Sequence, residues 1–391
     1  MHIKTSSWLK PATQRVSVIA MAFAMGSFPL SASAQSDAII SDQYPQLAEL
    51  FNAFDVTQAN AFDKIQEINS DPSTHQARNK LAMELDMAAN TPMSMSHGGH
   101  GGMDMDMDMG SGAPYADLEV AARVELMDIM RASYSGETSE MAFNESDAID
   151  RHTAEVLKRG RSFETNLFAI YIDDSISDKR AAVQNAIEEY LTDDQHAVAT
   201  FPKDSRYLLD HDQATGFTSA FPLLSGFLWT QQWLQLAALE SVILEELDDQ
   251  FANGHTIALE RFWNKIGSSG GMSMFPAPSE LPMSPAIAPN LYSQSQQAAI
   301  ILDNLNVLET VILDILSYPN VENREELMAE VVLNFTDKST DTAETMDYLL
   351  FALRGGIYDQ GGPAVGELMQ SERNRSRDEM GMQHSMIMSV Q

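Results

Sequence analysis

The segment Thr218–Asp249 constrains the fold more than any other part of this 391-residue chain. Projected at about 100° per residue, its large apolar side chains fall on one stripe, which is the pattern of a helix packed into a core. The stripe contains Trp229, Trp233, Leu236, Ile243 and Leu247. No segment alternates apolar and polar residues between hairpin turns, so strands are not expected. We therefore predict an all-α fold, a helical bundle whose helices are joined by loops.

Helical periodicity recurs along the rest of the chain. The other predicted helices are Tyr44–Asn69, Ser73–Asn90, Pro114–Ser133, Glu145–Asp173, Asp178–Leu191, Thr256–Ile266, Leu291–Ser317, Val321–Phe335 and Thr340–Arg354. Two core segments look alike, LAALESVILEEL at 236–247 and LNVLETVILDIL at 305–316. This likeness indicates either a duplication or two sequences that meet the same core constraint.

The first 34 residues have the three parts of a secretory signal peptide. Basic residues come first, the apolar run Val16–Met25 follows, and Ala32-Ser33-Ala34 provides a small-residue cleavage site. We expect a bacterial periplasmic or secreted protein whose mature chain begins near Gln35. No later stretch reaches the roughly 18 apolar residues that a membrane span needs.

The charge balance and the absence of cysteine narrow the function. The chain has 56 Asp and Glu against 24 Lys and Arg, a formal net charge of −32. Such a balance argues against nucleic acid and anionic membranes as partners and favours cations or basic proteins. The chain contains no cysteine, which excludes disulfides and thiolate metal sites. Methionine and histidine are then the remaining ligands for a soft metal.

The segment Thr91–Gly110, TPMSMSHGGHGGMDMDMDMG, has no aliphatic or aromatic residue that could anchor it in a core. In an extended chain its MDMDMDM run would place sulfurs on one side and carboxylates on the other. Thioethers suit Cu(I), and imidazoles also suit Cu(II). The alternative interpretation is a solvated linker that grew by repetition of Met-Asp.

The placement of methionine favours metal binding. Of the 24 methionines, six lie in 93–109, three in 272–283 and four in 380–388. Methionine that fills a core would instead lie on the apolar stripes of helices. Two of the three segments also contain histidine.

These segments resemble the Met- and His-rich regions of periplasmic copper-resistance and copper-binding proteins, whereas the helical remainder resembles no family. The resemblance implies binding, buffering or delivery of copper, and also of silver, with a copper transporter or a cuproprotein as partner. The ligands that it implies are Met93, Met95, His97, His100, Met103, Met105, Met107, Met109, Met382, His384, Met386 and Met388.

A second hypothesis is a helical metalloenzyme with a divalent metal in the bundle core. Helical projection points one metal-capable side chain inward from each of four helices, namely Glu125, His152, Glu240 and Glu309. A buried charge is costly unless it is paired or bound to a cation. Carboxylate-bridged bundles usually carry Glu-x-x-His pairs, and Asp193-x-x-His196 is the nearest match here. Buried salt bridges, for instance with Arg123 or Arg159, or boundary residues that reach water would explain the same pattern.

The sequence shows no sign of catalysis, so we assign no catalytic residue and expect a binding protein rather than an enzyme. Gly267–Gly271 matches a nucleophile elbow only formally, because no strand precedes it. A third hypothesis is an acidic adaptor for a basic partner, in which the Met-rich loops are contact surfaces.

The expected organisation is a signal peptide (1–34), N-terminal helices (35–90), a Met/His-rich loop (91–113), a helical bundle (114–376) with a Pro/Met-rich loop (267–290), and a Met/His-rich tail (377–391). Within the bundle, Gly355–Gly362 is expected to break the chain.

Overall fold

The structure is a computed structural model that describes residues 32–90, 113–136, 143–203, 211–267, 276–339, 342–354 and 356–365. Within these ranges it is all-α, as predicted, and the only β feature is an isolated bridge between Lys203 and Thr342. Most of the predicted signal peptide, the Met/His-rich loop and the tail lie outside the described residues. None of the described helices is long and apolar enough to span a membrane.

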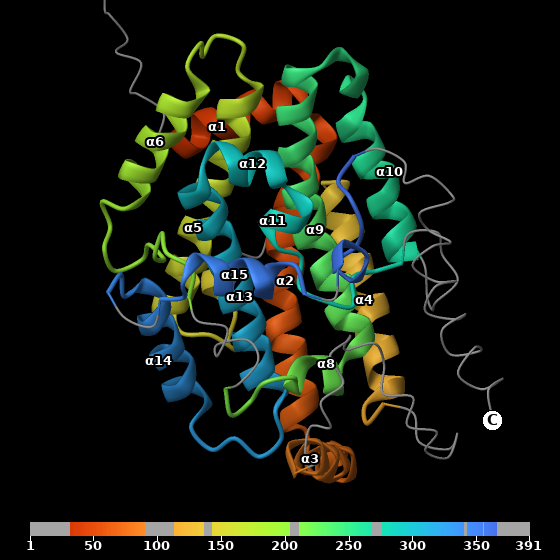
Figure 1. The fold of residues 1–391 in the computed structure, drawn as a ribbon. Helices are drawn as coiled ribbons and strands as arrows, with labels where there is room; N and C mark the ends of the chain where they lie inside the picture. The colour runs from red at the N-terminus through yellow and green to blue at the C-terminus, as the bar shows by residue number, and fades with distance from the viewer. Residues whose placement is uncertain are drawn as a thin grey trace, which may run out of the picture.

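The predicted helices occur in their predicted order, but α1, which begins within the predicted signal peptide, and α11 were not predicted (Figure 1). The helices of the structure are α1 (Ala32–Gln43), α2 (Pro45–Ser70), α3 (His75–Asn90), α4 (Ala116–Tyr134), α5 (Arg151–Ile172), α6 (Lys179–Tyr190), α8 (Gly216–Ala220), α9 (Pro222–Leu247), α10 (Gly254–Gly267), α11 (Ser284–Ile287), α12 (Pro289–Gln294), α13 (Gln296–Ser317), α14 (Arg324–Thr336), α15 (Thr345–Ala352) and α16 (Gly356–Asp359). Short 3-10 turns lie at Pro72–Thr74, Phe143–Glu145 and Asp249–Phe251.

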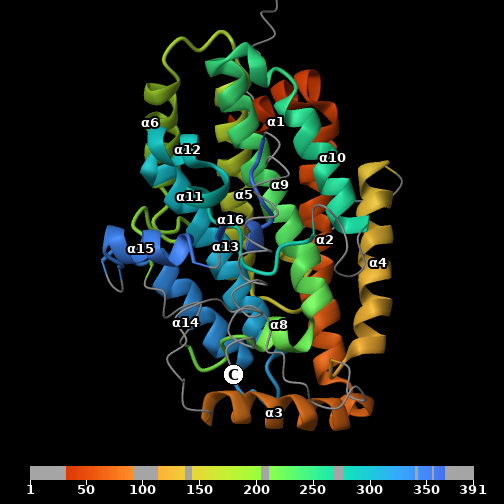
Figure 2. The same cartoon turned by 45° about the vertical axis from the view of Figure 1, so that its right-hand side comes forward.

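Two long helices, α9 and α13, run through the middle of the bundle, and the other helices surround them (Figures 1 and 2). Every side chain from Leu224 to Ile243 in α9 and from Ala298 to Ser317 in α13 is buried. The prediction that α9 buries only one face is therefore wrong, because all faces of its middle section are buried. Its last member, Leu247, is 61% exposed instead of buried. In contrast, α3 lies across one end of the bundle (Figure 2).

Proline and serine divide two of the predicted helices. Pro222 begins α9 and separates it from α8, and Ser295 separates α12 from α13. The Ser295 hydroxyl accepts a hydrogen bond from the N–H of Ala298 (3.3 Å), as an N-cap residue does. The chain therefore turns at these points, and the short helices pack against the long ones.

The predicted Pro/Met-rich loop at 267–290 is only partly a loop. From residue 276 onward the chain packs against the bundle, and Met283 is buried beside α11. The expectation that Met283 belongs to a loop-confined methionine segment is wrong, because this side chain fills a gap in the core. Met272 and Met274 lie outside the described residues.

Buried carboxylates on the long helices cap the starts of other helices. The Glu119 carboxylate of α4 accepts hydrogen bonds from the N–H groups of Leu223 (2.6 Å) and Leu224 (3.0 Å), in the first turn of α9. The Asp314 carboxylate of α13 accepts one from Phe217 N–H (2.8 Å) in α8. These N–H groups have no partner within their own helix, and a negative charge is favourable at that end.

Two further carboxylates act in the same way. Glu240 of α9 accepts hydrogen bonds from the backbone N–H groups of Asn290 (3.0 Å) and Leu291 (3.3 Å), which begin α12. Asp303 of α13 accepts one from Ser284 N–H (2.8 Å), which begins α11. The acidic residues of the central helices thus fix the positions of the short helices around them.

Candidate functional site

The predicted copper ligands from Met93 to Met109 and from Met382 to Met388 lie outside the described residues. The structure describes the chain that leads to the first group, because α3 ends at Asn90. On α3, Met83 and Met87 are 63% and 48% exposed. Their spacing of four residues places them on the same face of the helix. Two thioethers therefore face solvent directly before the predicted copper-binding segment.

The prediction that Glu125 points into the core is wrong. Glu125 is exposed and pairs with Lys64 of α2 at 3.1 Å. The buried face of α4 instead contains Ala122, Leu126 and the capping residue Glu119. Burial raises the pKa of Glu119 to about 7, although the hydrogen bonds that it accepts from two backbone N–H groups oppose this rise.

Glu309 is buried, as predicted, but its partner is a cation from another helix. The Arg161 guanidinium of α5 donates to both carboxylate oxygens of Glu309 at 3.0 Å. Gln232 of α9 also donates to Glu309 (2.5 Å). The alternative of a buried salt bridge is therefore correct for Glu309, with Arg161 rather than Arg123 or Arg159 as its partner.

Glu240 is also buried, but it does not meet Glu309. The Gln232 side chain that contacts Glu309 lies eight residues before Glu240 on α9. Eight residues of α-helix span about 12 Å, whereas ligand bonds to a first-row metal are about 2 Å long. The two carboxylates are therefore too far apart to bind one metal ion. They nevertheless hold the same position, the fifth, in the two similar segments 236–247 and 305–316.

Arg161 is the centre of a buried polar network that joins four helices. Besides Glu309 of α13, the guanidinium contacts Glu164 at 3.0 Å, Asp55 of α2 at 3.5 Å and the side-chain Oε1 of Gln58 at 2.9 Å. Burial opposes the charge on Arg161, but the surrounding carboxylates hold its pKa above the ordinary value. Burial raises the pKa of Glu164, while Arg161 opposes that rise. The hydrogen bonds and ion pairs of this network hold α2, α5, α9 and α13 together.

His152 lies near the start of α5 and meets a histidine instead of the predicted glutamates. Its ring centroid is 5.0 Å from that of His196. His196 is also paired, through Nδ1, with an Asp193 carboxylate oxygen at 2.9 Å. Across the described part of the chain, no group of three or more His, Asp or Glu side chains could hold a metal ion. The predicted four-residue core site therefore does not form there.

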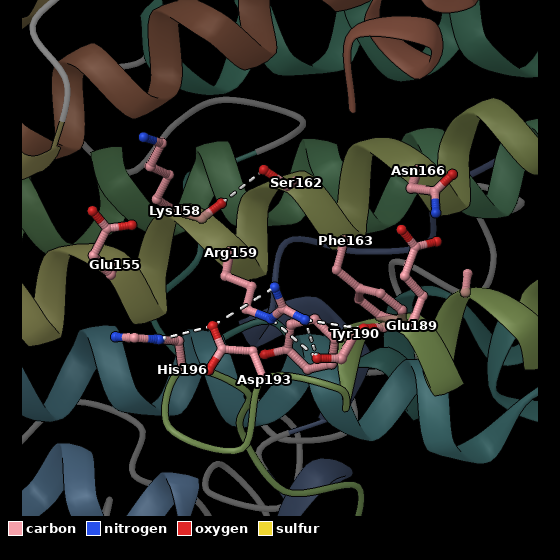
Figure 3. A pocket seen from close by; sticks show the side chains of 11 residues that line it. Glu155, Lys158, Arg159, Ser162, Phe163, Asn166, Glu189, Tyr190, Asp193 and His196 are labelled. Atoms are coloured by element: carbon pink, nitrogen blue, oxygen red, sulfur yellow. Dashed lines mark hydrogen bonds and ion pairs between the residues drawn. The ribbon is translucent and has the colours of Figure 1, made fainter. Parts of the chain in front are cut away.

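A pocket of about 360 Å³ opens between α5, α6 and the turn that follows α6 (Figure 3). Arg159 crosses its floor and donates to the carbonyl oxygens of Glu189 (3.0 Å) and Tyr190 (2.5 Å). These carbonyls end α6, so the guanidinium acts as a C-terminal cap. The side chains of Asp193 and His196 line one end of the pocket.

Sequence reasoning missed a buried lysine, Lys265 of α10. Its ammonium donates to the carbonyl oxygens of Gly361 and Pro276 and lies 4.5 Å from the centroid of the Trp233 ring. Burial lowers the pKa of Lys265 to about 7. The Trp233 indole N–H also donates to Gly362 (3.1 Å). The sequence predicts only a break in the chain at Gly355–Gly362. The partners of Lys265 are backbone carbonyl oxygens, which a pattern of side chains does not reveal.

The remaining histidines of the described residues include two that pair singly with carboxylates. His211 contacts Asp314 at 3.2 Å, and His255 contacts Glu245 at 2.7 Å. His75 contacts Asn79 on the exposed side of α3. The sequence favours surface or capping roles for four lone histidines, His75, His196, His211 and His255, but His196 lies beside a second imidazole, that of His152.

The structure defines the class of this protein at the level of the fold, an all-α helical bundle. No protein-family model, no curated protein and no solved structure matches this chain. The functional argument therefore depends on the chain's own residues.

Proposed function

We propose that this protein binds copper in the bacterial periplasm and buffers or delivers it. The methionines of the 93–109 and 380–388 segments would bind Cu(I), and His97, His100 and His384 would assist with Cu(II). The observation that carries the proposal is the concentration of methionine in segments that have few other apolar residues. Thioethers are soft and uncharged, and this makes them suitable ligands for Cu(I) and Ag(I).

The use of methionine in the described bundle supports this proposal. Of the 24 methionines in the chain, the described core buries Met127, Met130, Met283 and Met328. The exposed Met83 and Met87 of α3 would provide two further thioether ligands shortly before residue 93 in the sequence.

The high negative charge supports cation uptake rather than a reaction. The alternation of Met and Asp in 103–109 would raise the local concentration of cations next to soft ligands. The buried carboxylates that motivated a core metalloenzyme already hold helix ends or Arg161. We therefore favour binding and delivery, with a copper transporter or a cuproprotein as the partner.

Competition with a chromophoric Cu(I) chelator tests the proposal. The full chain is expected to withdraw Cu(I) from the chelator, and replacing the six methionines of 93–109 by leucine should remove much of that capacity. Leucine keeps the apolar volume and removes only the sulfur. The matched control is Met346→Leu, which removes an exposed thioether outside these segments.

Unchanged competition by the six-leucine variant, or equal losses in the Met346→Leu control, would refute the assignment of the ligands. Failure of the unaltered chain to compete for Cu(I) would refute the function itself. In that case, capture of a basic partner without metal would favour the acidic adaptor.

A further inference from the structure

Two histidines that are 44 residues apart in the sequence form an imidazole pair beside the α5–α6 pocket. The rings of His152 and His196 have centroids 5.0 Å apart and planes tilted by 52°. His152 lies two residues after Asp150, the N-cap of α5, and His196 lies in the turn after α6. The helical framework therefore fixes both imidazoles close together.

Asp193 orients one of these imidazoles. Its carboxylate is 2.9 Å from His196 Nδ1, and this hydrogen bond holds the pKa of Asp193 below its usual value. With Nδ1 engaged by a carboxylate, the lone pair of neutral His196 is on Nε2. Figure 3 shows this far nitrogen pointing away from Asp193, toward the end of α5 at which the helix begins. A carboxylate behind an imidazole is the usual outer-shell arrangement around a metal-binding histidine.

The other imidazole has an unused nitrogen. His152 Nε2 is buried and has no hydrogen-bond partner among the residues that the structure describes. A buried polar atom without a partner is unfavourable, because it has lost its hydrogen bonds to water. A metal ion bound at this nitrogen would remove that penalty.

The surroundings provide negative charge. Glu155 lies one turn after His152 on α5 and lines the same pocket as His196. His196 lines this pocket, and the ring of His152 lies beside that of His196. Arg159 lies 4.0 Å from Asp193, on the side away from His196, and is engaged with the end of α6.

We propose that His152 and His196 bind one divalent transition-metal ion, with Asp193 as the outer carboxylate and water as the remaining ligands. Imidazole binds Cu(II), Ni(II) and Zn(II), and the usual order of affinities places Cu(II) first. This site is separate from the Met/His segments and takes a different oxidation state of copper from their thioethers. It does not depend on the function proposed above.

Electron paramagnetic resonance with Cu(II) alone as the probe tests the site. The protein is the full chain in which His97, His100 and His384 are replaced by Asn. One tightly bound Cu(II) is expected, with hyperfine coupling to imidazole nitrogens. His152→Asn and His196→Asn should each abolish this signal, and Asp193→Asn should weaken binding by about 10–100-fold. The matched control is His255→Asn, because His255 also pairs with a carboxylate, Glu245, at 2.7 Å but has Tyr44 beside it instead of a second imidazole.

A signal that persists in His152→Asn or His196→Asn would overturn the proposal, as would an equal loss in His255→Asn. If a variant does not fold, the unaltered chain decides the matter by NMR. Substoichiometric Cu(II) should broaden the imidazole resonances of His152 and His196 before that of His255, and the opposite order would refute the site. Cu(I) competition by the Met/His segments is measured separately, so failure of one proposal leaves the other intact.

Discussion

At the scale of residues, Arg161 is a buried cation with three acidic partners in the described bundle. It is buried on α5 and faces Glu309, Glu164 and Asp55, so acidic groups outnumber the cation around it. Removing one partner from a buried ion pair leaves charges that neither water nor another cation compensates. The sequence did not reveal this role, because an arginine on a helix face looks the same whether it reaches solvent or a buried acid.

Arg161→Leu is expected to lower the free energy of unfolding by about 3–5 kcal/mol, measured by urea denaturation. Arg131→Leu is the control, since its pair with Asp128 is exposed, and surface changes usually alter stability by less than about 0.5 kcal/mol. A similar small effect for both variants would show that the buried carboxylates around Arg161 are held in their neutral form.

Stability should also depend on pH through Glu119. The pKa of this carboxyl rises from its ordinary value of 4.5 to about 7 in the folded protein, so between these values the folded state retains a proton that the unfolded chain has lost. Stability therefore falls as pH rises through this window. Asp303 acts in the same direction, because burial raises its pKa from 3.8 to about 7.

The thermal midpoint is therefore expected to decrease between about pH 5 and about pH 7, below the range in which the lowered pKa of Lys265 acts in the opposite direction. Glu119→Gln keeps an oxygen that accepts the N–H groups of α9 but cannot titrate, so its midpoint should change less over the same range. Glu125→Gln, on the exposed side of the same helix, should retain the full slope. Parallel slopes in Glu119→Gln and the unaltered chain would contradict the assignment.

At the scale of elements, periodicity predicted the helices well but not all of their faces. On α4 the exposed side carries Leu118, Val120 and Val124, so apolar residues occur on both sides of the helix. A projection that follows the apolar residues therefore chose the side with Glu125 instead of the side with Glu119. On α9 and α13 no polar face exists, and only the structure shows which partner satisfies each buried polar group.

At the scale of the whole molecule, the buried apolar residues from Ile40 to Ala364 form one continuous core. The all-α class was predictable because helical periodicity occurs throughout the chain. The imidazole pair was not predictable, because nothing in the sequence places His152 next to His196. The copper ligands stay a prediction from composition and spacing.

Deleting residues 93–109 should shift the thermal midpoint of the metal-free protein very little. These residues include no aliphatic or aromatic side chain that could anchor them in a core, and exposed connections tolerate change. Differential scanning calorimetry of the metal-free deletion variant measures the effect, with Trp233→Ala as the comparison for a buried side chain. Trp233→Ala should cost about 3–5 kcal/mol. A comparable loss in the deletion variant would show that the segment packs against the bundle.

The helix caps on α13 also set an order of folding. Asp303 and Asp314 accept hydrogen bonds from the first turns of α11 and α8, and Glu309 pairs with Arg161 of α5. All three acidic residues follow those helices in the sequence, so the ribosome adds them later. A growing chain that ends before α13 thus lacks the carboxylates that cap α8 and α11, and Arg161 has only Glu164 and Asp55 as acidic partners. The starts of α8 and α11 therefore gain all of their capping contacts only when residues up to Asp314 have been made.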